Sequence, residues 1–312
     1  MLNVMSQCVV PVQCRIGGLI LAMILLAGSA VPGAAQERDD DAFRPPAPLQ
    51  QQGDSQTQHP LLGRSPASAP ANLVTRAAAG LQGVGFGDVA VADVNDDQRQ
   101  DLLVVGSGTA TLYLQNSDKT FEAAGAGLTA VEGTWPSASI ADVDGNGTMD
   151  LLITGETANS AASATLYLQD SDGTFSEAGA NLTGVFESAT SIADVNGDTH
   201  PDLLITGQDA GLNYTATLYY GNGDGTFDRA NAGLKAVTNG STAIADVNDD
   251  GRPDLVVAGF DTNFENSTRI YLQQSDGSFS TAGADVMGIS NGSVSVADVD
   301  GNGTLDLLLV GW

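Results

Sequence analysis

The stretch "DVDGNGTLDLLLVG" (residues 298–311) joins an acidic loop to a run of leucine and valine, and it decides the fold. Close copies begin at Asp93, Asp142, Asp194 and Asp246, and successive copies start 49, 52, 52 and 52 residues apart. Self-similarity at a period of about 40–50 residues is typical of proteins in which each repeat is one small unit packed on its neighbours.

Each copy lies in a unit with four strand-like segments. In the second unit these are "SIAD" (139–142), "DLLITG" (150–155), "TLYLQ" (165–169) and "FSEAGANLTGV" (175–185). The short apolar run after the loop is typical of a strand buried on both faces. Asp-Gly before the last segment indicates a hairpin turn. The units therefore predict four-stranded antiparallel sheets, which a β-propeller repeats as blades.

The number of loops predicts five blades. Residues 73–84 ("LVTRAAAGLQGV") align with the fourth segment of later units, and the fifth unit ends after its second segment. We expect these N- and C-terminal strands to share the last blade, which then lacks a third strand. Two alternatives are an open fragment of a seven-blade propeller and a β-solenoid, whose period is usually shorter.

The acidic loops have the composition of a calcium site. Asp or Asn recurs at loop positions 1, 3, 5 and 9, and alternate residues of a tight turn direct their oxygens inward. Three carboxylates held this close repel one another unless a cation lies among them. Ca²⁺, which takes about 6–8 oxygen ligands, suits such a loop, and the backbone carbonyl at position 7 would add a ligand.

We therefore predict up to five Ca²⁺ sites. The side-chain ligands are Asp93, Asn95, Asp97 and Asp101; Asp142, Asp144, Asn146 and Asp150; Asp194, Asn196, Asp198 and Asp202; Asp246, Asn248, Asp250 and Asp254; and Asp298, Asp300, Asn302 and Asp306. The carbonyl ligands are those of Thr148, Arg252 and Thr304.

Position 6 distinguishes the loops. Glycine, which tolerates positive φ, occupies it in the second, fourth and fifth loops. Gln98 and Thr199 occupy it in the first and third, so we expect the sites beginning at Asp93 and Asp194 to be weaker.

The loops have two other interpretations, an EF-hand and a turn that holds no metal. An EF-hand needs Glu at position 12 and a following helix, whereas Ile153 stands there in the second loop, inside a strand segment. A metal-free Asp/Asn/Gly turn is common for these residue types. Five copies of one fixed spacing favour the metal site over that turn.

The combination of "DVDGNGTMDLLITG" (142–155) with "ATLYLQDSDGTF" (164–175) resembles the FG-GAP/VCBS repeat family, whose blades also build the integrin α-subunit head. The resemblance covers residues 73–312. The "FG" pair survives only as Phe86-Gly87 and the "GAP" portion is absent, so the bacterial-type repeat group is favoured. The resemblance implies Ca²⁺ between the first and second strands of a blade, and a secreted or surface-exposed binding module.

The N-terminal segment has the pattern of an export signal. Arg15 precedes the apolar run at 16–30, and small residues precede a cleavage site after Ala35. We expect residues 1–35 to be a cleaved signal peptide, which leaves no membrane span. An uncleaved anchor is the alternative, because residues 16–35 carry no charge. The protein is thus expected to be secreted or held at the cell surface.

Composition divides the rest of the chain. Residues 36–72 are rich in proline and glutamine and are expected to be a disordered linker before the repeat domain at 73–312. Both cysteines, Cys8 and Cys14, lie in the signal segment, so the mature chain would have no thiol.

The formal net charge of −27 argues against nucleic acid as a partner. His59 and His200 are the two histidines, and no Ser/His/Asp, Cys/His or HExxH set is present. We therefore expect a binding or adhesion module for extracellular protein or glycan rather than an enzyme. A carbohydrate-active enzyme fragment and a purely structural surface protein are the alternatives.

Strand direction predicts where a ligand would bind. The acidic loops and the "SDGT" turns share one side of the sheets, so the other connections share the opposite side. A ligand surface is expected there, unless its aromatic residues pack between blades instead. These aromatic residues are Phe86, Trp135, Phe186, Tyr214 and Phe264.

Overall fold

The computed structural model describes residues 15–16, 19–20, 80–283 and 286–312. A short antiparallel pair joins β1 (Arg15–Ile16) to β2 (Leu19–Ile20). Apart from that pair, the predicted signal peptide and linker lie outside the described residues. Within the described part of the chain, no helix has the length and apolar character needed to cross a membrane.

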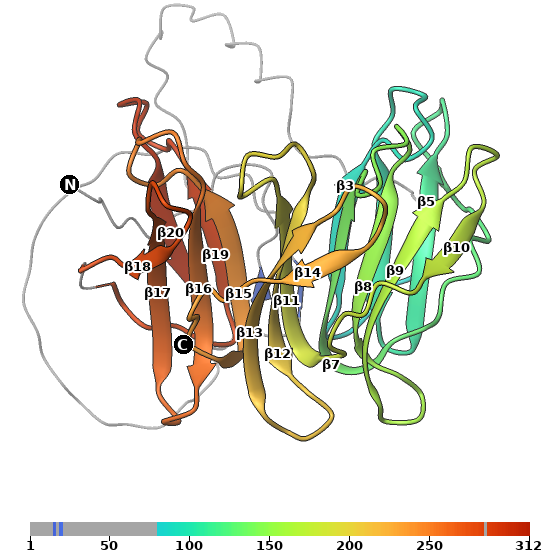
Figure 1. Cartoon of the computed structure of the whole chain (residues 1–312). Helices are drawn as coiled ribbons and strands as arrows, with labels where there is room; N and C mark the ends of the chain where they lie inside the picture. Colours follow the sequence, from blue (N-terminus) through green and yellow to red (C-terminus); the bar gives the residue numbers. More distant parts are fainter. Residues whose placement is uncertain (1–14, 17–18, 21–79, 284–285) are drawn as a thin grey trace, which may run out of the picture. The chain divides into compact units, whose positions relative to one another are not determined.

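All elements between residues 88 and 310 are strands, arranged in repeated units (Figure 1). The first unit is β3 (Asp88–Ala92), β4 (Asp101–Gly106), β5 (Thr109–Gln115) and β6 (Phe121–Ala123); the second is β7 (Glu132–Ala141), β8 (Asp150–Glu156), β9 (Ala162–Gln169) and β10 (Phe175–Ala178); the third is β11 (Phe186–Ala193), β12 (Asp202–Gln208), β13 (Tyr214–Gly221) and β14 (Phe227–Arg229); the fourth is β15 (Val237–Ala245), β16 (Asp254–Asp261), β17 (Asn266–Gln273) and β18 (Phe279–Thr281); the fifth is β19 (Ser293–Ala297) and β20 (Asp306–Val310).

Strands within a unit pair antiparallel in chain order, which confirms the predicted four-stranded sheets in the first four units. One backbone pair, Thr215 with Val237, links the third and fourth sheets into a larger one. The same contact appears as an isolated bridge earlier in the chain, between Thr109 and Val131 and between Ser163 and Val185. The starts of the second, third and fourth units are therefore each paired with the third strand of the unit before.

The core lies between the sheets and is built largely by the second strands. Leu203, Leu204 and Ile205 of β12 are each at most 2% exposed, so that strand is buried on both faces as predicted. Leu204 packs with Leu255 of the following unit, whereas Leu203 packs with Leu152 of the preceding one. Each unit thus completes its core only against its neighbours.

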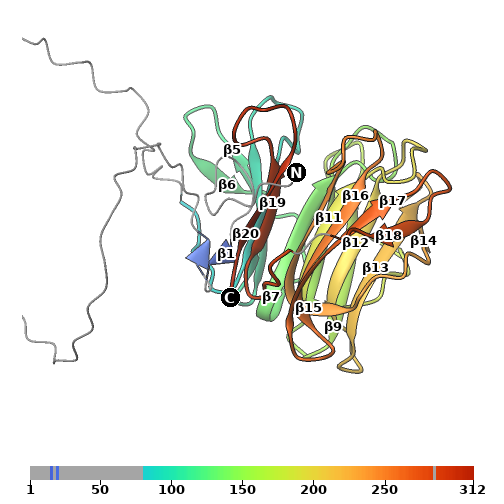
Figure 2. The ribbon, with the colours of Figure 1, turned by 90° about the vertical axis from the view of Figure 1, so that its left-hand side faces the viewer.

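The first strands of consecutive units lie next to one another, β3 by β7, β7 by β11, β11 by β15 and β15 by β19 (Figure 2). Together they line a cavity of about 330 Å³. All five first strands contribute residues to its wall, so the units are arranged about this cavity.

The fourth strands are shorter than predicted. The segment 175–185 was expected to be one strand, but β10 ends at Ala178. Asn181 has φ 50° and, in the first unit, Gly125 and Gly127 have φ 63° and 68°. These left-handed residues take the backbone out of the strand and carry it toward the next unit.

The predicted strand at residues 73–84 is not formed by its described part. Residues 80–84 have no strand pairing, and the Gln82 N–H donates to the Tyr113 hydroxyl at 3.2 Å. Thr129 donates to Tyr167 in the same way at 2.8 Å. Residues 80–84 therefore repeat the irregular connector that precedes a first strand, and they add nothing to β19 and β20. Residues 73–79 lie outside the described residues.

Candidate functional site

Each acidic loop begins just after a first strand and ends at position 9, the first residue of the second strand. Within the loop, side chains accept hydrogen bonds from the loop backbone. In the fifth loop, Asp298 Oδ2 accepts from the Gly303 N–H at 2.9 Å, and Asn302 Oδ1 accepts from the Thr304 N–H at 2.8 Å. Equivalent bonds occur in the other four loops, so the 1-3-5 spacing folds each loop around its own oxygens.

Position 6 has positive φ in all five loops, as the glycine pattern predicted. Gln98 and Thr199 adopt φ 67° and 76° although neither is glycine. Position 4 also has positive φ, a feature missed in the sequence, and there Asp96 and Asp249 adopt 58° and 60°. The backbone turns are thus the same in every loop, and only their strain differs.

The carboxylate at position 9 is buried and holds the loop to the sheet. Asp202 accepts from the N–H groups of Val195 at 2.7 Å and Gly221 at 2.8 Å, which ties the loop to the end of β13. Burial raises the pKa of Asp202, and that of Asp254. Burial likewise raises the pKa of Asp150 to about 6, against the lowering effect of its own backbone hydrogen bonds.

Three carboxylates converge in two of the loops. The groups are Asp142, Asp144 and Asp150 in the second loop, and Asp298, Asp300 and Asp306 in the fifth. One oxygen from each residue of a group lies within 4.8 Å of the others. In the second loop, Asp142 Oδ1 is buried and finds no hydrogen-bond partner in the part of the chain that the structure describes. Converging carboxylates with an unpaired buried oxygen fit a metal ion, so these two loops could each hold one.

In the other three loops, the position 5 carboxylate already has partners. Asp97 forms an ion pair with Arg99, and Asp250 forms one with Arg252 at 2.5 Å. In the third loop, Asp198 Oδ2 accepts from the side-chain amide of Asn196 at 2.8 Å. Among the described residues, these loops bring together no group of three carboxylates as close as those above. In the sequence, the second and fifth loops have Asp at position 3 and Asn at position 5, whereas the other three have Asn and Asp there; the first and fourth loops also have arginine at position 7.

The acidic loops share one side of the sheets with the turns after the third strands, as strand direction predicted. The Thr148 hydroxyl donates to the Gln169 carbonyl at 2.7 Å, and Arg252 Nε donates to the Gln273 carbonyl at 3.1 Å.

Of the five aromatic residues expected on the opposite side, two meet. The rings of Phe86 and Trp135 make an edge-to-face contact with centroids 5.8 Å apart. Phe264 contacts Phe260 instead, at 6.0 Å. Phe186 and Tyr214 are half-buried at the starts of β11 and β13 and take part in neither contact.

Phe86 and Trp135 belong to a set that the sequence reasoning missed. Both stand seven residues before the first Asp of their loop, and so does one residue in every other unit. All five are non-glycine residues with positive φ. We call this set the rim: Phe86 (φ 49°), Trp135 (59°), Glu187 (49°), Asn239 (49°) and Asn291 (48°).

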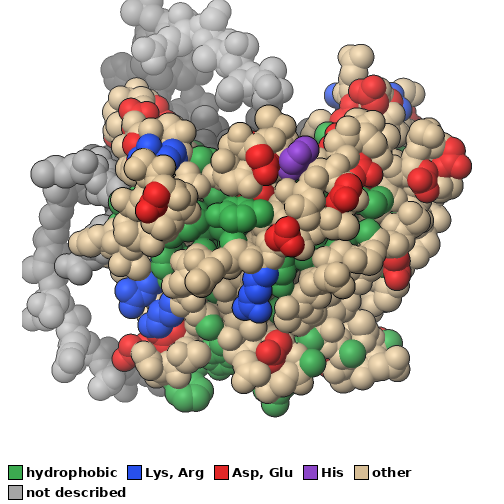
Figure 3. Space-filling model, in the orientation of Figure 1, with side chains coloured by type: hydrophobic (Ala, Val, Ile, Leu, Met, Phe, Trp, Pro, Cys, Tyr) green, Lys and Arg blue, Asp and Glu red, His purple; other side chains and the backbone are tan. Residues whose placement is uncertain are grey.

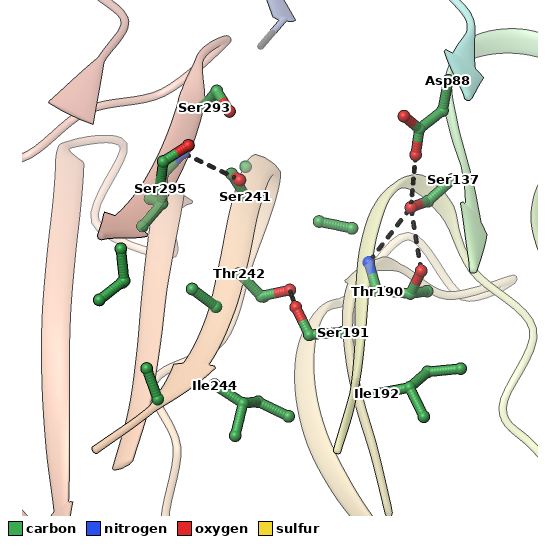
Figure 4. A pocket seen from close by; sticks show the side chains of 16 residues that line it. Asp88, Ser137, Thr190, Ser191, Ile192, Ser241, Thr242, Ile244, Ser293 and Ser295 are labelled. Atoms are coloured by element: carbon green, nitrogen blue, oxygen red, sulfur yellow. Dashed lines mark hydrogen bonds between the residues drawn. The ribbon is translucent and has the colours of Figure 1, made fainter. Parts of the chain in front are cut away.

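The rim borders the central cavity. Two residues after each rim residue, the chain contributes to the cavity wall (Figure 4). Those wall residues are Asp88, Ser137, Ala189, Ser241 and Ser293. Aligning the units on their acidic loops puts these five residues in one column, but their side chains differ in chemistry, so the sequence alone does not mark the rim.

Comparison with known proteins gives one family. The model of the FG-GAP-like repeat matches residues 93–153, 194–257 and 246–309, together more than half of the chain. No curated protein matches the sequence.

Solved structures with similar folds include a lectin of Agrocybe aegerita that recognises non-reducing terminal N-acetylglucosamine (21% identity, TM-score 0.46, covering 71% of this chain and 59% of the lectin). They also include a thermostable family-43 glycoside hydrolase (11% identity, TM-score 0.41, covering 76% and 93%). A third is an endo-1,4-beta-xylanase of Bacteroides thetaiotaomicron (13% identity, TM-score 0.34, covering 63% and 75%). The chain spans only 59% of the lectin's length, and at TM-scores below 0.5 these likenesses say nothing about what it binds.

Proposed function

This chain belongs to the FG-GAP-like repeat family, and on that premise we propose that it is an exported, calcium-stabilised β-propeller that binds an extracellular protein or glycan. The propeller reading is supported by the first strands of all five units, which line one cavity. Four complete sheets and the two strands β19 and β20 then correspond to five blades.

The observation that carries the calcium proposal is the second loop, where Asp142, Asp144 and Asp150 converge around an unpaired buried oxygen. The donor set consists of oxygens alone, which favours a hard cation over zinc or copper. Acidic side chains are also spread over the surface shown in Figure 3, in keeping with 38 Asp and Glu against 11 Lys and Arg. Bound calcium would offset part of the repulsion among them.

Calcium is expected to raise the melting temperature by about 5 °C or more at 10 mM. Two sites with dissociation constants of about 10⁻⁴–10⁻³ M would each add about 1.4–2.7 kcal/mol, and each kcal/mol shifts a domain of this size by about 2–4 °C. Mg²⁺ should do less, because it demands stricter octahedral geometry. The test is thermal unfolding in calcium, magnesium and chelator, with the Asp144→Asn/Asp300→Asn double variant as the control that loses the response. Identical curves in calcium and chelator would refute the proposal.

Removing the arginine of the fourth loop is expected to strengthen its calcium binding severalfold. In Arg252→Gln, the Asp250 carboxylate loses its ion-pair partner and a positive charge leaves the site. The matched control is Arg269→Gln, an exposed arginine on β17 that changes the net charge equally. Calorimetric titration measures both variants. Equal calcium binding by both would show that the arginine does not compete with the ion.

The binding role is favoured over a purely structural role or an enzyme fragment by the rim, where polar and aromatic side chains are held at strained backbone positions. It is tested by screening the purified chain, with and without calcium, against immobilised glycans and cell-surface proteins. Binding to neither would favour the structural role.

A further inference from the structure

We propose that the rim and the cavity beneath it form a binding site for a neutral, hydroxyl-rich sugar residue. This inference rests on the proposed binding role but uses none of the acidic loops. The side chains involved come from the first strands of all five units and from the residues just before β3 and β19, on the side of the sheets opposite the predicted calcium.

The first observation is the strain at the rim. A left-handed conformation costs a non-glycine residue about 1–3 kcal/mol, and glycine would remove most of that cost. None of the five rim positions is glycine. The pairing register shifts between Phe186 and Ala189 in β11 and between Thr238 and Ser241 in β15, and over the longer stretch from Glu132 to Ser137 in β7, so Glu187, Asn239 and Trp135 each lie inside an irregularity of the pairing. Bulges re-aim side chains and are common next to binding sites.

The second observation is a series of contacts that links the rim residues, through two side-chain pairs, the neighbouring Thr134 and one backbone hydrogen bond. Phe86 meets Trp135 as described, and the next contact is from the Thr134 hydroxyl to Glu187 Oε1 at 3.5 Å. The Asn239 side-chain amide then donates to Glu187 Oε2 at 3.0 Å. The Asn291 N–H donates to the Asn239 carbonyl at 2.7 Å. An aromatic pair, a carboxylate and an amide are thus joined in one surface.

The third observation is an acceptor without a donor. Asn239 Oδ1 is buried and has no hydrogen-bond partner among the described residues, while the Nδ2 of the same amide donates to Glu187. A buried acceptor left unpaired costs about 1–3 kcal/mol. Because this oxygen is shielded from solvent, a ligand hydroxyl would reach it only after the Asn239 side chain turns outward; the hydroxyl would then remove this cost and lie next to the Glu187 carboxylate.

The cavity continues this chemistry inward (Figure 4). Its volume of about 330 Å³ lies within the range of about 300–1,000 Å³ typical of small-molecule sites. Hydroxyl groups line its upper part, where Ser137 and Thr190 are 3.0 Å apart, and Ile192 and Ile244 line its lower part. Asp88, at 1% exposure, accepts from the Ser137 hydroxyl at 3.0 Å, which places a buried carboxylate in the wall.

These groups select among ligand classes. Phosphate and acidic peptides are disfavoured by Glu187, by Asp88 and by the net charge of −27. An apolar ligand would leave Asn239 Oδ1 unpaired. A metal ion would make no use of Phe86 and Trp135. A sugar ring offers an apolar C–H face for the aromatic pair and hydroxyl donors for the carboxylate and the amide.

The experiment uses the purified chain with Trp312→Phe, so that Trp135 is the remaining tryptophan. The probes are the methyl glycosides of glucose, galactose, mannose and N-acetylglucosamine, read by tryptophan fluorescence and by saturation-transfer NMR. We expect at least one glycoside to bind saturably at millimolar concentration. Trp135→Ala, read by NMR, and Glu187→Gln should each weaken the binding of that glycoside at least tenfold. Trp135→Phe, which keeps an aromatic ring, should weaken it less.

The matched control is Leu212→Ala, because Leu212 is 67% exposed and lies outside the rim; this variant should bind as the parent does. Absence of binding by all four glycosides, or undiminished binding by Trp135→Ala, overturns the inference. If the chain is retained on immobilised glycans or proteins while free glycosides neither bind nor compete, the binding role stands and the rim site fails. If the chain is retained on neither the immobilised glycans nor the proteins, and no free glycoside binds, the binding role and the rim site both fail.

Discussion

Replacing Asp202 with alanine is expected to destabilise the repeat region by about 3 kcal/mol or more, even in chelator. Asp202 accepts three backbone hydrogen bonds, from Val195 at 2.7 Å, Asn196 at 3.2 Å and Gly221 at 2.8 Å. The carboxylate is fully buried, so alanine leaves these donors without an acceptor, at about 1–3 kcal/mol each. Burial raises the pKa of Asp202, which shows that the buried charge is itself unfavourable. Removing that charge offsets only part of the loss. The measurement is urea unfolding with chelator present.

Two alanine variants serve as controls for Asp202. Asp198 is a predicted ligand in the same loop but is exposed, so Asp198→Ala should leave the unfolding curve in chelator nearly unchanged. Asp306 also occupies position 9 but accepts one backbone bond, from Val299 at 3.0 Å, because within the described ranges no third strand pairs with β20. Asp306→Ala should therefore cost less than Asp202→Ala. If Asp202→Ala lost as little stability in chelator as Asp198→Ala, position 9 would have no structural role apart from metal binding.

The fold was predictable where one local pattern decided it. The spacing of the acidic loops gave the repeat, and the continuous apolar run gave the buried second strand, as in β12. The fourth strand was overestimated because "FSEAGANLTGV" reads as one extended segment, and its end depends on the left-handed turn at Asn181. The position of residues 80–84 could not be predicted from the sequence either, because it depends on the hydrogen bond from Gln82 to the hydroxyl of Tyr113, 31 residues further along the chain.

The candidate sites were predictable in residue type but not in arrangement. All five loops carry Asp or Asn at the same positions, yet only the second and fifth bring three carboxylates within 4.8 Å among the described residues. Glycine at position 6 did not foresee this, because the fourth loop has Gly251 and also Arg252 next to it. The rim escaped notice because its five side chains differ in chemistry and share only a backbone conformation.

That shared conformation depends on a glycine at the end of each second strand, so Gly207→Ala is expected to cost about 3 kcal/mol or more. Gly207 has φ 148°, and a Cβ there would lie 2.8 Å from the Phe186 carbonyl oxygen and 3.1 Å from Ser188 Cα. These residues flank Glu187, so either the substituted strand or the bulge that holds Glu187 must move. The melting temperature should fall by about 6–12 °C.

Two other glycines separate backbone strain from the contact. Gly173 has φ 83° with open space around its Cβ position, so Gly173→Ala should cost about 1 kcal/mol from conformation alone. Gly179 has neither a left-handed φ nor a neighbour within 4 Å, so Gly179→Ala should be neutral or slightly stabilising. In thermal unfolding, Gly207→Ala should lose the most stability, Gly173→Ala less, and Gly179→Ala the least. If Gly207→Ala cost no more than Gly173→Ala, the bulge could yield at little cost, and the rim would be less rigid than its contacts imply.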